Sequence, residues 1–303
     1  MDINIMIEAQ AGVYWPEWKR IVRTVESLGF DGLYRSDHFS HGSPPTQAAL
    51  ELWVSLTWLA ANTERISFGS LVSPAAFRSP AMTAQMALQV DDLSGGRLRL
   101  GLGAGWHAGE HRAFGYPLLD VGPRFARFRE YLEVVTRLLR SDAPVSFEGE
   151  TYTLDGALLL PRPARPGGPP ITIGGNGRLR TLPLVARYAD EWNAIWCTPA
   201  KWQELSATLD GLLVAAGRAP ARVRRTMMTG IFFGRTDAEL AAVLAQRGQS
   251  AEDLRAAGAV VGTAGAVRDQ LGALATAGLD GVMLQWLDLQ AWGRLEALAE
   301  AVR

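Results

Sequence analysis

Apolar residues recur along this chain in two alternating patterns, and the alternation predicts the fold class. Short apolar runs rich in Ile, Val, Leu and Phe are followed by longer segments in which apolar positions repeat every three or four residues. The first pattern is typical of buried strands and the second of amphipathic helices. The eight predicted strands span residues 3–9, 31–37, 66–72, 97–103, 170–175, 191–196, 224–234 and 281–286.

Helices are predicted after these strands, and glycine or proline marks many of their ends. Pro80 stands in the first turn of one helix, where its missing N–H has no intrahelical partner to lose. Strands alternating with helices indicate a parallel sheet, and eight such units in 303 residues favour a closed (β/α)8 TIM barrel over an open doubly wound sheet. The predicted helices span residues 15–28, 47–61, 80–93, 124–139, 178–188, 200–216, 237–246, 263–277 and 290–302.

The segment from residue 143 to residue 170 departs from this alternation. Its first half has the character of a hairpin around Glu148 and Gly149, and its second half, PRPARPGGPP, reads as a loop. We interpret it as an insertion between the fourth helix and the fifth strand of an α/β barrel. A single domain is therefore predicted over residues 1–303.

Composition and charge exclude several classes of protein. Hydrophobic residues make up 48% of the chain, and 30 basic against 31 acidic residues give a net charge of −1, which argues against a nucleic-acid or membrane-surface binder. No run of about 18 apolar residues predicts a membrane span, and the first ten residues lack the basic segment of a signal peptide. Cys197 is the only cysteine, so an intramolecular disulfide is excluded. We expect a cytoplasmic globular protein.

The carboxyl ends of the strands carry the chemistry of a (β/α)8 barrel, and the second predicted strand ends in Asp37 and His38. A histidine next to an acid at such a position is suited to donate or accept a proton near neutral pH. The alternative is a buried structural histidine that a loop carbonyl holds in place.

Two glycine-rich turns follow the fourth and the fifth predicted strands. The GLGAG turn at residues 101–105 lacks the third glycine of a dinucleotide fingerprint, and we interpret it as room for a planar ring against the backbone. The GGNG turn at residues 174–177 precedes Arg178 and Arg180, an arrangement suited to a phosphate group. The alternative for the GGNG turn is that its glycines only allow a tight bend.

His107, Glu110 and His111 match the H-x-x-E-H pattern of some zinc peptidases. That pattern needs a regular helix to bring both imidazoles onto one face, and Gly105 and Gly109 argue against such a helix. We therefore predict no metal site, and expect Glu110 and His111 to line a pocket instead.

Three tryptophans, Trp106, Trp196 and Trp286, lie at or near the ends of predicted strands. They would give a substrate pocket apolar walls. The alternative for each is ordinary packing between the barrel and its helices.

With these features in place, the sequence resembles the luciferase-like monooxygenase superfamily, and within it the branch of oxidoreductases that depend on the deazaflavin coenzyme F420. The GFDGLYRSDHF segment and the glycine-rich stretch that ends in GLGAGWHAGEHRAFG carry the resemblance most clearly. The resembling segments occupy residues 29–39, 66–115, 169–194 and 260–286.

The resemblance implies a barrel with an insertion, a non-proline cis peptide at Ser70–Leu71, and catalytic roles for His38, Asp37 and Glu110. We expect His38 to transfer the proton, with its imidazole oriented by Asp37 or by a backbone group. The implied cofactor-binding residues are Asp37, His38, Ser70, Leu71, Ser73, Gly103, Ala104, Gly105, Gly174, Gly175, Asn176 and Thr198, and the expected substrate pocket includes Trp106, His111, Trp196 and Trp286.

The function implied is hydride transfer between F420 and a small, fairly hydrophobic ketone, enone or imine. Lys19 and Lys201 are the only lysines, which argues against the lysine-rich phosphate site of sugar-phosphate dehydrogenases in this branch. Two alternatives stay open: an FMN-dependent monooxygenase that uses reduced flavin and oxygen, and a barrel that binds flavin without turnover. The resemblance also implies a homodimer.

Overall fold

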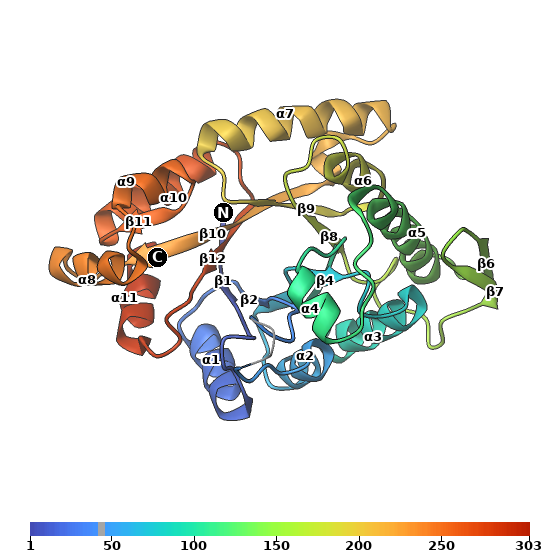
Figure 1. Cartoon of the computed structure of the whole chain (residues 1–303), viewed down its shortest axis with the longest axis horizontal. Coiled ribbons are helices and arrows are strands. Elements are labelled where there is room, and N and C mark those ends of the chain that lie inside the picture. Colours follow the sequence, from blue (N-terminus) through green and yellow to red (C-terminus); the bar gives the residue numbers. More distant parts are fainter. Residues whose placement is uncertain (42–45) are drawn as a thin grey trace.

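Eight parallel strands form a closed ring at the centre of the computed structural model, which describes residues 1–41 and 46–303 (Figure 1). The ring closes because β10 pairs with both β9 and β12, and β12 pairs with β1. The predicted (β/α)8 fold is therefore confirmed. The strands, in their order around the ring, are β1 (Asp2–Ile7), β2 (Gly32–Arg35), β3 (Ser67–Ser70), β5 (Leu98–Gly103), β8 (Ile171–Gly174), β9 (Glu191–Ile195), β10 (Arg224–Phe233) and β12 (Gly281–Gln285).

Helices surround the ring and bury their apolar faces against it (Figure 1). Capping side chains set several of their first residues: Ser79 accepts the N–H of Met82, and Thr198 accepts that of Lys201. None of the described helices is long and apolar enough to cross a bilayer. The main helices are α1 (Trp15–Ser27), α2 (Leu52–Ala61), α3 (Pro80–Leu93), α5 (Val121–Arg140), α6 (Thr181–Tyr188), α7 (Pro199–Ala215), α8 (Asp237–Arg247), α10 (Ala264–Thr276) and α11 (Trp292–Val302).

Two sequence expectations about helices are wrong. The helix predicted from residue 47 begins at Leu52, because the Glu51 side chain accepts the N–H of Val54 and caps it there. The stretch in which Gly105 and Gly109 argued against a helix forms a short one, α4 (Ala108–Ala113). The short elements β4 (Ser73–Pro74), η1 (Pro220–Arg222), α9 (Ala251–Ala256) and β11 (Val260–Gly262) were also not predicted.

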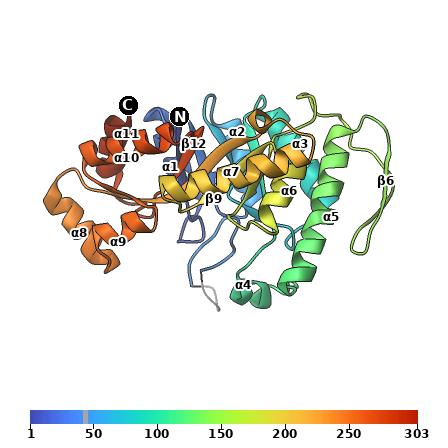
Figure 2. The same ribbon diagram turned by 90° about the horizontal axis from the view of Figure 1, so that it is seen from above.

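The irregular segment forms an antiparallel hairpin, β6 (Val145–Glu148) and β7 (Thr153–Ala157), between α5 and β8 as expected. Figure 2 shows the hairpin outside α5, away from the ring. The carboxylate of Glu130 on α5 accepts the N–H groups of Glu150 and Thr151 at 3.0 and 2.8 Å. This contact fixes the hairpin turn to α5. That the whole chain is one domain stays a prediction.

The glycines of β5 are required by the close approach of the chain after β3. A Cβ on Gly101 would lie 1.8 Å from the carbonyl oxygen of Ser70, and one on Gly103 would lie 2.5 Å from the Val72 side chain. The cis peptide is Leu71–Val72, one bond later than the predicted Ser70–Leu71. The Leu71 N–H still donates to the Arg35 carbonyl at 2.8 Å, so the chain leaves the ladder with β2 only after Leu71.

Gly101→Ala tests this close approach. A methyl group has no space beside the Ser70 carbonyl, so we expect a loss of at least about 1–3 kcal/mol in the free energy of unfolding, measured by chemical denaturation. The matched control is Gly272→Ala in the exposed middle of α10, where a Cβ meets nothing within 4 Å. It should stabilise the protein by up to about 1 kcal/mol. Equal stability of the Gly101→Ala and wild-type proteins would contradict the packing argument.

Candidate functional site

A cavity of about 510 Å³ opens at the carboxyl ends of the barrel strands, a volume within the range of about 300–1,000 Å³ found for small-molecule sites. Most of its wall is apolar or glycine, and a few polar groups point into it. Its lining consists of Met6, Glu8, Ser36, His38, Leu71, Val72, Pro74, Gly103, Ala104, Gly105, Trp106, Arg124, Phe125, Gly174, Asn193, Ile195 and Met228.

The structure gathers part of the predicted site around this cavity and leaves the rest outside it. The predicted residues that line the cavity are His38, Leu71, Gly103, Ala104, Gly105, Trp106 and Gly174. Those that do not are Asp37, Ser70, Ser73, Glu110, His111, Gly175, Asn176, Thr198, Trp196 and Trp286.

His38 is held by Glu110, whose carboxylate lies behind the cavity wall. The distance from His38 Nδ1 to Glu110 Oε2 is 2.8 Å. Glu110 is fully buried, and it also accepts the backbone N–H groups of Phe39 and Ser40. Burial opposes ionisation of the Glu110 carboxyl, but the hydrogen bonds and the charge of His38 outweigh it and lower the Glu110 pKa. A carboxylate is therefore fixed against one imidazole nitrogen.

The same contact sets the charge of His38. Burial disfavours the imidazolium, yet the hydrogen bond and negative charge of Glu110, with a smaller contribution from Glu8, raise the His38 pKa above its ordinary value. Because the Glu110 carboxylate accepts a hydrogen bond from Nδ1–H, Nε2 is the ring nitrogen that remains to exchange a proton with a ligand in the cavity. His38 can thus accept a proton at Nε2 when neutral and donate one when protonated.

His107 also lies beside Glu110, with its Nδ1 3.7 Å from Oε2. The ligand atoms of His38, His107 and Glu110 lie within 4.8 Å of one another. Glu110 is therefore grouped with His38, from the loop after β2, and with His107, but not with His111. The 2.8 Å between His38 and Glu110 is a hydrogen-bond distance. Two ligands around one zinc ion, each at about 2.0–2.1 Å in tetrahedral geometry, lie about 3.3 Å apart. The geometry favours the hydrogen bond, and we assign no metal.

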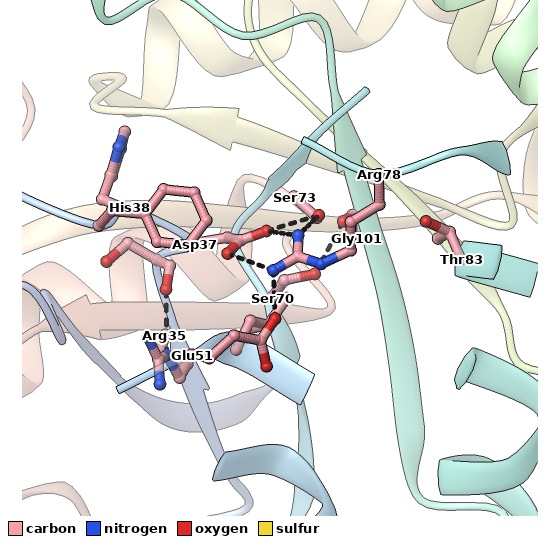
Figure 3. Close-up of polar contacts among 12 residues, drawn as sticks. Arg35, Asp37, His38, Glu51, Ser70, Ser73, Arg78, Thr83 and Gly101 are labelled. Carbon is pink, nitrogen blue, oxygen red and sulfur yellow. Dashed lines mark hydrogen bonds and ion pairs between the residues drawn. The ribbon is translucent and has the colours of Figure 1, made fainter. Parts of the chain in front are cut away.

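Asp37 forms a buried ion pair with Arg78, and it does not orient His38, contrary to the sequence expectation. Figure 3 shows its carboxylate facing the Arg78 guanidinium, with the His38 side chain directed away from both. Arg78 Nη2 donates to Asp37 Oδ1 at 3.2 Å, and Ser73 Oγ donates to Oδ2 at 2.6 Å. Arg78 also pairs with Glu51. Asp37 and Ser73 therefore join the loop after β2 to β4, outside the lining of the cavity.

The other predicted cofactor residues outside the cavity satisfy backbone groups. Ser70 Oγ donates to the Gly101 carbonyl at 2.7 Å, and Asn176 bonds the N–H and carbonyl of Ile195 at 2.9 and 2.6 Å. Thr198 caps α7, and Gly175 has a φ of +126°, a conformation that favours glycine. These side chains shape the ends of β3, β8 and β9.

His111, Trp196 and Trp286 pack away from the cavity, so their predicted place in the substrate pocket is not observed. His111 is buried beside Phe77, with ring centroids 5.3 Å apart, and burial lowers the pKa of its imidazole. Trp196 packs edge-on against Phe232, and the indole N–H of Trp286 donates to the Asp288 carbonyl at 2.7 Å. Trp106 alone of the three tryptophans lines the cavity.

Ten of the cavity residues were not predicted from the sequence, and two groups among them carry its further charged side chains. Glu8, just after β1, accepts the amide N–H groups of Gln285 and Gln10 at 2.6 and 2.7 Å, and Ser36 donates to Gln10. The signal was available, because Glu8 and Gln285 stand at the carboxyl ends of barrel strands. Arg124 and Phe125 come from α5, and only the tertiary fold brings that helix over the cavity mouth.

The arrangement suits a flat ligand that undergoes a proton transfer at its edge. Gly103, Ala104 and Gly105 present backbone rather than bulky side chains, and Leu71 and Val72 form an apolar backing. His38 Nε2 is the titrating group at the wall, and Glu8 and Arg124 add one negative and one positive charge. Arg124 Nε is buried and has no hydrogen-bond partner among the described residues.

The family model described as "Luciferase-like monooxygenase" matches residues 3–255. The chain is 37% identical over 208 residues to the F420-dependent glucose-6-phosphate dehydrogenase of Intrasporangium calvum, covering 66% of this chain and 58% of that protein. It is 35% identical over 234 residues to the same enzyme of Nocardia farcinica, covering 75% and 66%. The match thus spans less than two thirds of these relatives' length.

Solved structures share the fold along the whole chain. An F420-dependent secondary alcohol dehydrogenase in complex with an F420-acetone adduct superposes with a TM-score of 0.82 at 19% identity, covering 100% of this chain and 99% of that one. The coenzyme F420-dependent tetrahydromethanopterin reductase of Methanopyrus kandleri gives 0.80 at 18% identity, covering 99% and 98%. At these identities the likeness shows the barrel fold alone.

Glu110→Gln tests the coupling between Glu110 and His38. Removing the negative charge leaves burial as the dominant influence, so the His38 pKa should fall below its ordinary value of about 6.5. The measurement is an NMR titration of the imidazole C–H signals. In the control, Asp37→Asn, the lost charge is one that Arg78 already neutralises, so the His38 pKa should change much less. A larger shift in Asp37→Asn than in Glu110→Gln would contradict this assignment.

Proposed function

Because the chain belongs to the luciferase-like monooxygenase family, we propose that it is an F420-dependent oxidoreductase that transfers a hydride between the coenzyme and a small carbonyl or imine substrate. The observation that carries the proposal is the pairing of His38 with Glu110 at the wall of a cavity backed by backbone and apolar groups. The F420-dependent relatives support the choice of coenzyme.

The residues present fit a deazaflavin ring. Leu71, Val72 and the Gly103–Gly105 backbone offer a flat apolar surface, and the cavity volume of about 510 Å³ suits a tricyclic ring with a small substrate beside it. F420 supplies hydride transfer at the ring carbon that replaces the flavin N5. We propose that the ring lies between these residues and His38.

His38 carries the proton that accompanies the hydride. Reduction of a ketone to an alcohol adds a hydride to carbon and a proton to oxygen, and the protonated imidazole donates that proton from Nε2. In the oxidation direction the neutral imidazole takes the proton from the hydroxyl group at the same nitrogen. Glu110 stabilises the imidazolium and fixes the tautomer in both directions. It acts as a positioning residue, because it is buried behind His38.

We propose a small and fairly hydrophobic ketone, enone or imine as the substrate. Met6, Phe125 and Met228 contribute apolar surface to the cavity, and Trp106, with 70% of its surface exposed, stands at the opening. None of the described cavity residues is a lysine, which argues against a phosphosugar even though the matched relatives are named for one. A cytoplasmic homodimer is part of this proposal.

An FMN-dependent monooxygenase is the second candidate, favoured by the fold likeness to the monooxygenase RslO1 from Streptomyces bottropensis, with a TM-score of 0.81 at 21% identity. The His38–Glu110 pair argues for the first candidate, since it is built to move a proton at the cavity wall. Binding without turnover is the third possibility and predicts no reaction with any substrate.

Cofactor titration separates these candidates. We expect F420 to bind with micromolar or better affinity by fluorescence, and to be bleached or restored only when a carbonyl, imine or alcohol substrate is present. FMN should bind more weakly, and reduced FMN should cause no substrate-dependent oxygen consumption. Preferred binding of FMN with oxygen uptake would refute F420 dependence, whereas binding of F420 without turnover across ketones, cyclic enones and imines would favour the non-catalytic barrel.

His38→Ala should lower the rate of F420-linked turnover by about 10²- to 10⁴-fold, the usual contribution of a positioned acid or base. Coenzyme affinity, measured by fluorescence, should change far less. In the wild-type enzyme, ketone reduction should slow as the pH rises through the raised His38 pKa, because the donor form is lost. The control is His41→Ala, which removes an exposed histidine on the same loop. Full activity of the His38 variant would refute the proton-transfer role.

A further inference from the structure

A second cavity, of about 770 Å³, lies at the amino ends of the strands, on the opposite side of the barrel from the first. Figure 2 shows α5 running from the end at which α4 lies to the other end of the molecule. Arg124 in the first turn of α5 lines the first cavity, and Arg140 at its last residue lines the second. A helix of 20 residues spans about 30 Å, so the two cavities are separate.

Six arginines line this second cavity. They reach it from different parts of the barrel: a strand, the ends of two helices, the loop after the hairpin, and the segment that precedes β10. They are Arg99, Arg140, Arg165, Arg187, Arg218 and Arg222, and Asp190 is the one acidic side chain in the lining.

Carboxylates do not balance this charge. Asp190 pairs with Arg140 at 2.9 Å and also accepts the N–H of Ile171, so it holds the start of β8 as well. Glu133 pairs with Arg187 at 3.2 Å but binds Arg137, outside the cavity, more closely at 2.7 Å. Each of these carboxylates therefore also binds a group outside the cavity, so it neutralises the cavity arginine only in part.

The remaining acids lie behind the cavity wall. Asp91 is buried and pairs with Arg165 at 3.2 Å. Glu191, also buried, is 3.8 Å from Arg99 and 3.6 Å from Arg224, which does not line the cavity. The Arg99 pair is long, so its guanidinium keeps donors for a further partner.

Arg218 and Arg222 have no carboxylate partner within the described residues. Arg218 donates to the carbonyls of Val185, Ala186 and Ala189 at the end of α6. Burial lowers the pKa of Arg218, and the positive charges of Arg140 and Arg222 lower it further. The negative charge of Asp190 acts in the opposite direction. Arg222 is exposed, and its side chain forms no hydrogen bond or ion pair with any described residue. The cavity thus holds uncompensated positive charge.

We propose that this cavity is a binding site for a small polyanion of the pyrophosphate class, such as a diphosphate or a phosphorylated metabolite. Guanidinium groups donate paired N–H bonds in the geometry that phosphate oxygens accept, and here they converge from several sides of a concave site. None of the lining residues is aromatic, so nothing offers a stacking surface for the bases of a nucleic acid. The ligand is therefore compact and highly charged.

Calorimetric titration of the F420-loaded protein with sodium pyrophosphate, at constant ionic strength, tests the proposal. With F420 in the first cavity, pyrophosphate cannot bind there, so the measured heat reports the second cavity. The same titration of the coenzyme-free protein tests the second cavity even if F420 proves not to be the coenzyme. We expect one site per chain with a dissociation constant below about 1 mM, weakening as salt is added.

Arg222→Ala is the informative variant, because it removes an exposed guanidinium without a protein partner and should leave folding intact. It should weaken pyrophosphate binding about tenfold, equivalent to about 1.4 kcal/mol. The control, Arg23→Ala, removes another exposed arginine, on the outer face of α1, and should bind like the wild type.

Three results would overturn the proposal. The first is no binding heat at millimolar pyrophosphate, and the second is equal weakening in the Arg222 and Arg23 variants, which would mean unspecific screening. The third is a polyglutamate peptide that binds more tightly than pyrophosphate and depends on Arg222, which would make the cavity a docking surface for an acidic protein segment.

Discussion

The hydrogen bond between the Glu110 carboxylate and His38 is the contact on which the site depends. Glu110 is fully buried, and it is tolerated there because the imidazole and two backbone N–H groups satisfy its oxygens. The bond joins the loop after β2 to α4, which follows β5, so one contact fixes the position of the titrating side chain at the cavity wall. Without this hydrogen bond, the buried Glu110 carboxylate would lack its cationic partner, and the loop after β2 would lose its side-chain contact with α4.

The shape of the cavity follows from the backbone rather than from large side chains. Val72 leaves the β3 ladder toward β5, and Gly101, Gly103 and Gly174 are the residues that let it do so. The same glycines leave a flat wall. The GLGAG motif, which suggested contact with a planar ring, is thus explained first by the packing of β5 against the chain after β3. The space for a ligand is a consequence of that packing.

The fold could be predicted because the eight barrel strands and the main helices show characteristic spacings of apolar residues in the sequence, and the eight barrel strands all lie where the pattern predicted them. The contacts within the site could not, because they join residues that no local pattern connects. Asp37 adjoins His38 in sequence but faces Arg78, while the partner of His38 is 72 positions away. The cis peptide lies one bond later than the family resemblance implied.

Strand polarity also explains what the sequence analysis overlooked at the other end of the barrel. In a parallel sheet, the residues that precede the strands lie together at one edge, and the residues that follow the strands lie together at the other. Arg165 precedes β8, Asp190 precedes β9 and Arg222 precedes β10. In the linear sequence these residues are scattered among the 28 arginines of a chain with a net charge of −1, so composition conceals the cluster that closure of the ring creates. A balanced overall charge therefore does not exclude a strongly charged site, because the fold decides which charges become neighbours.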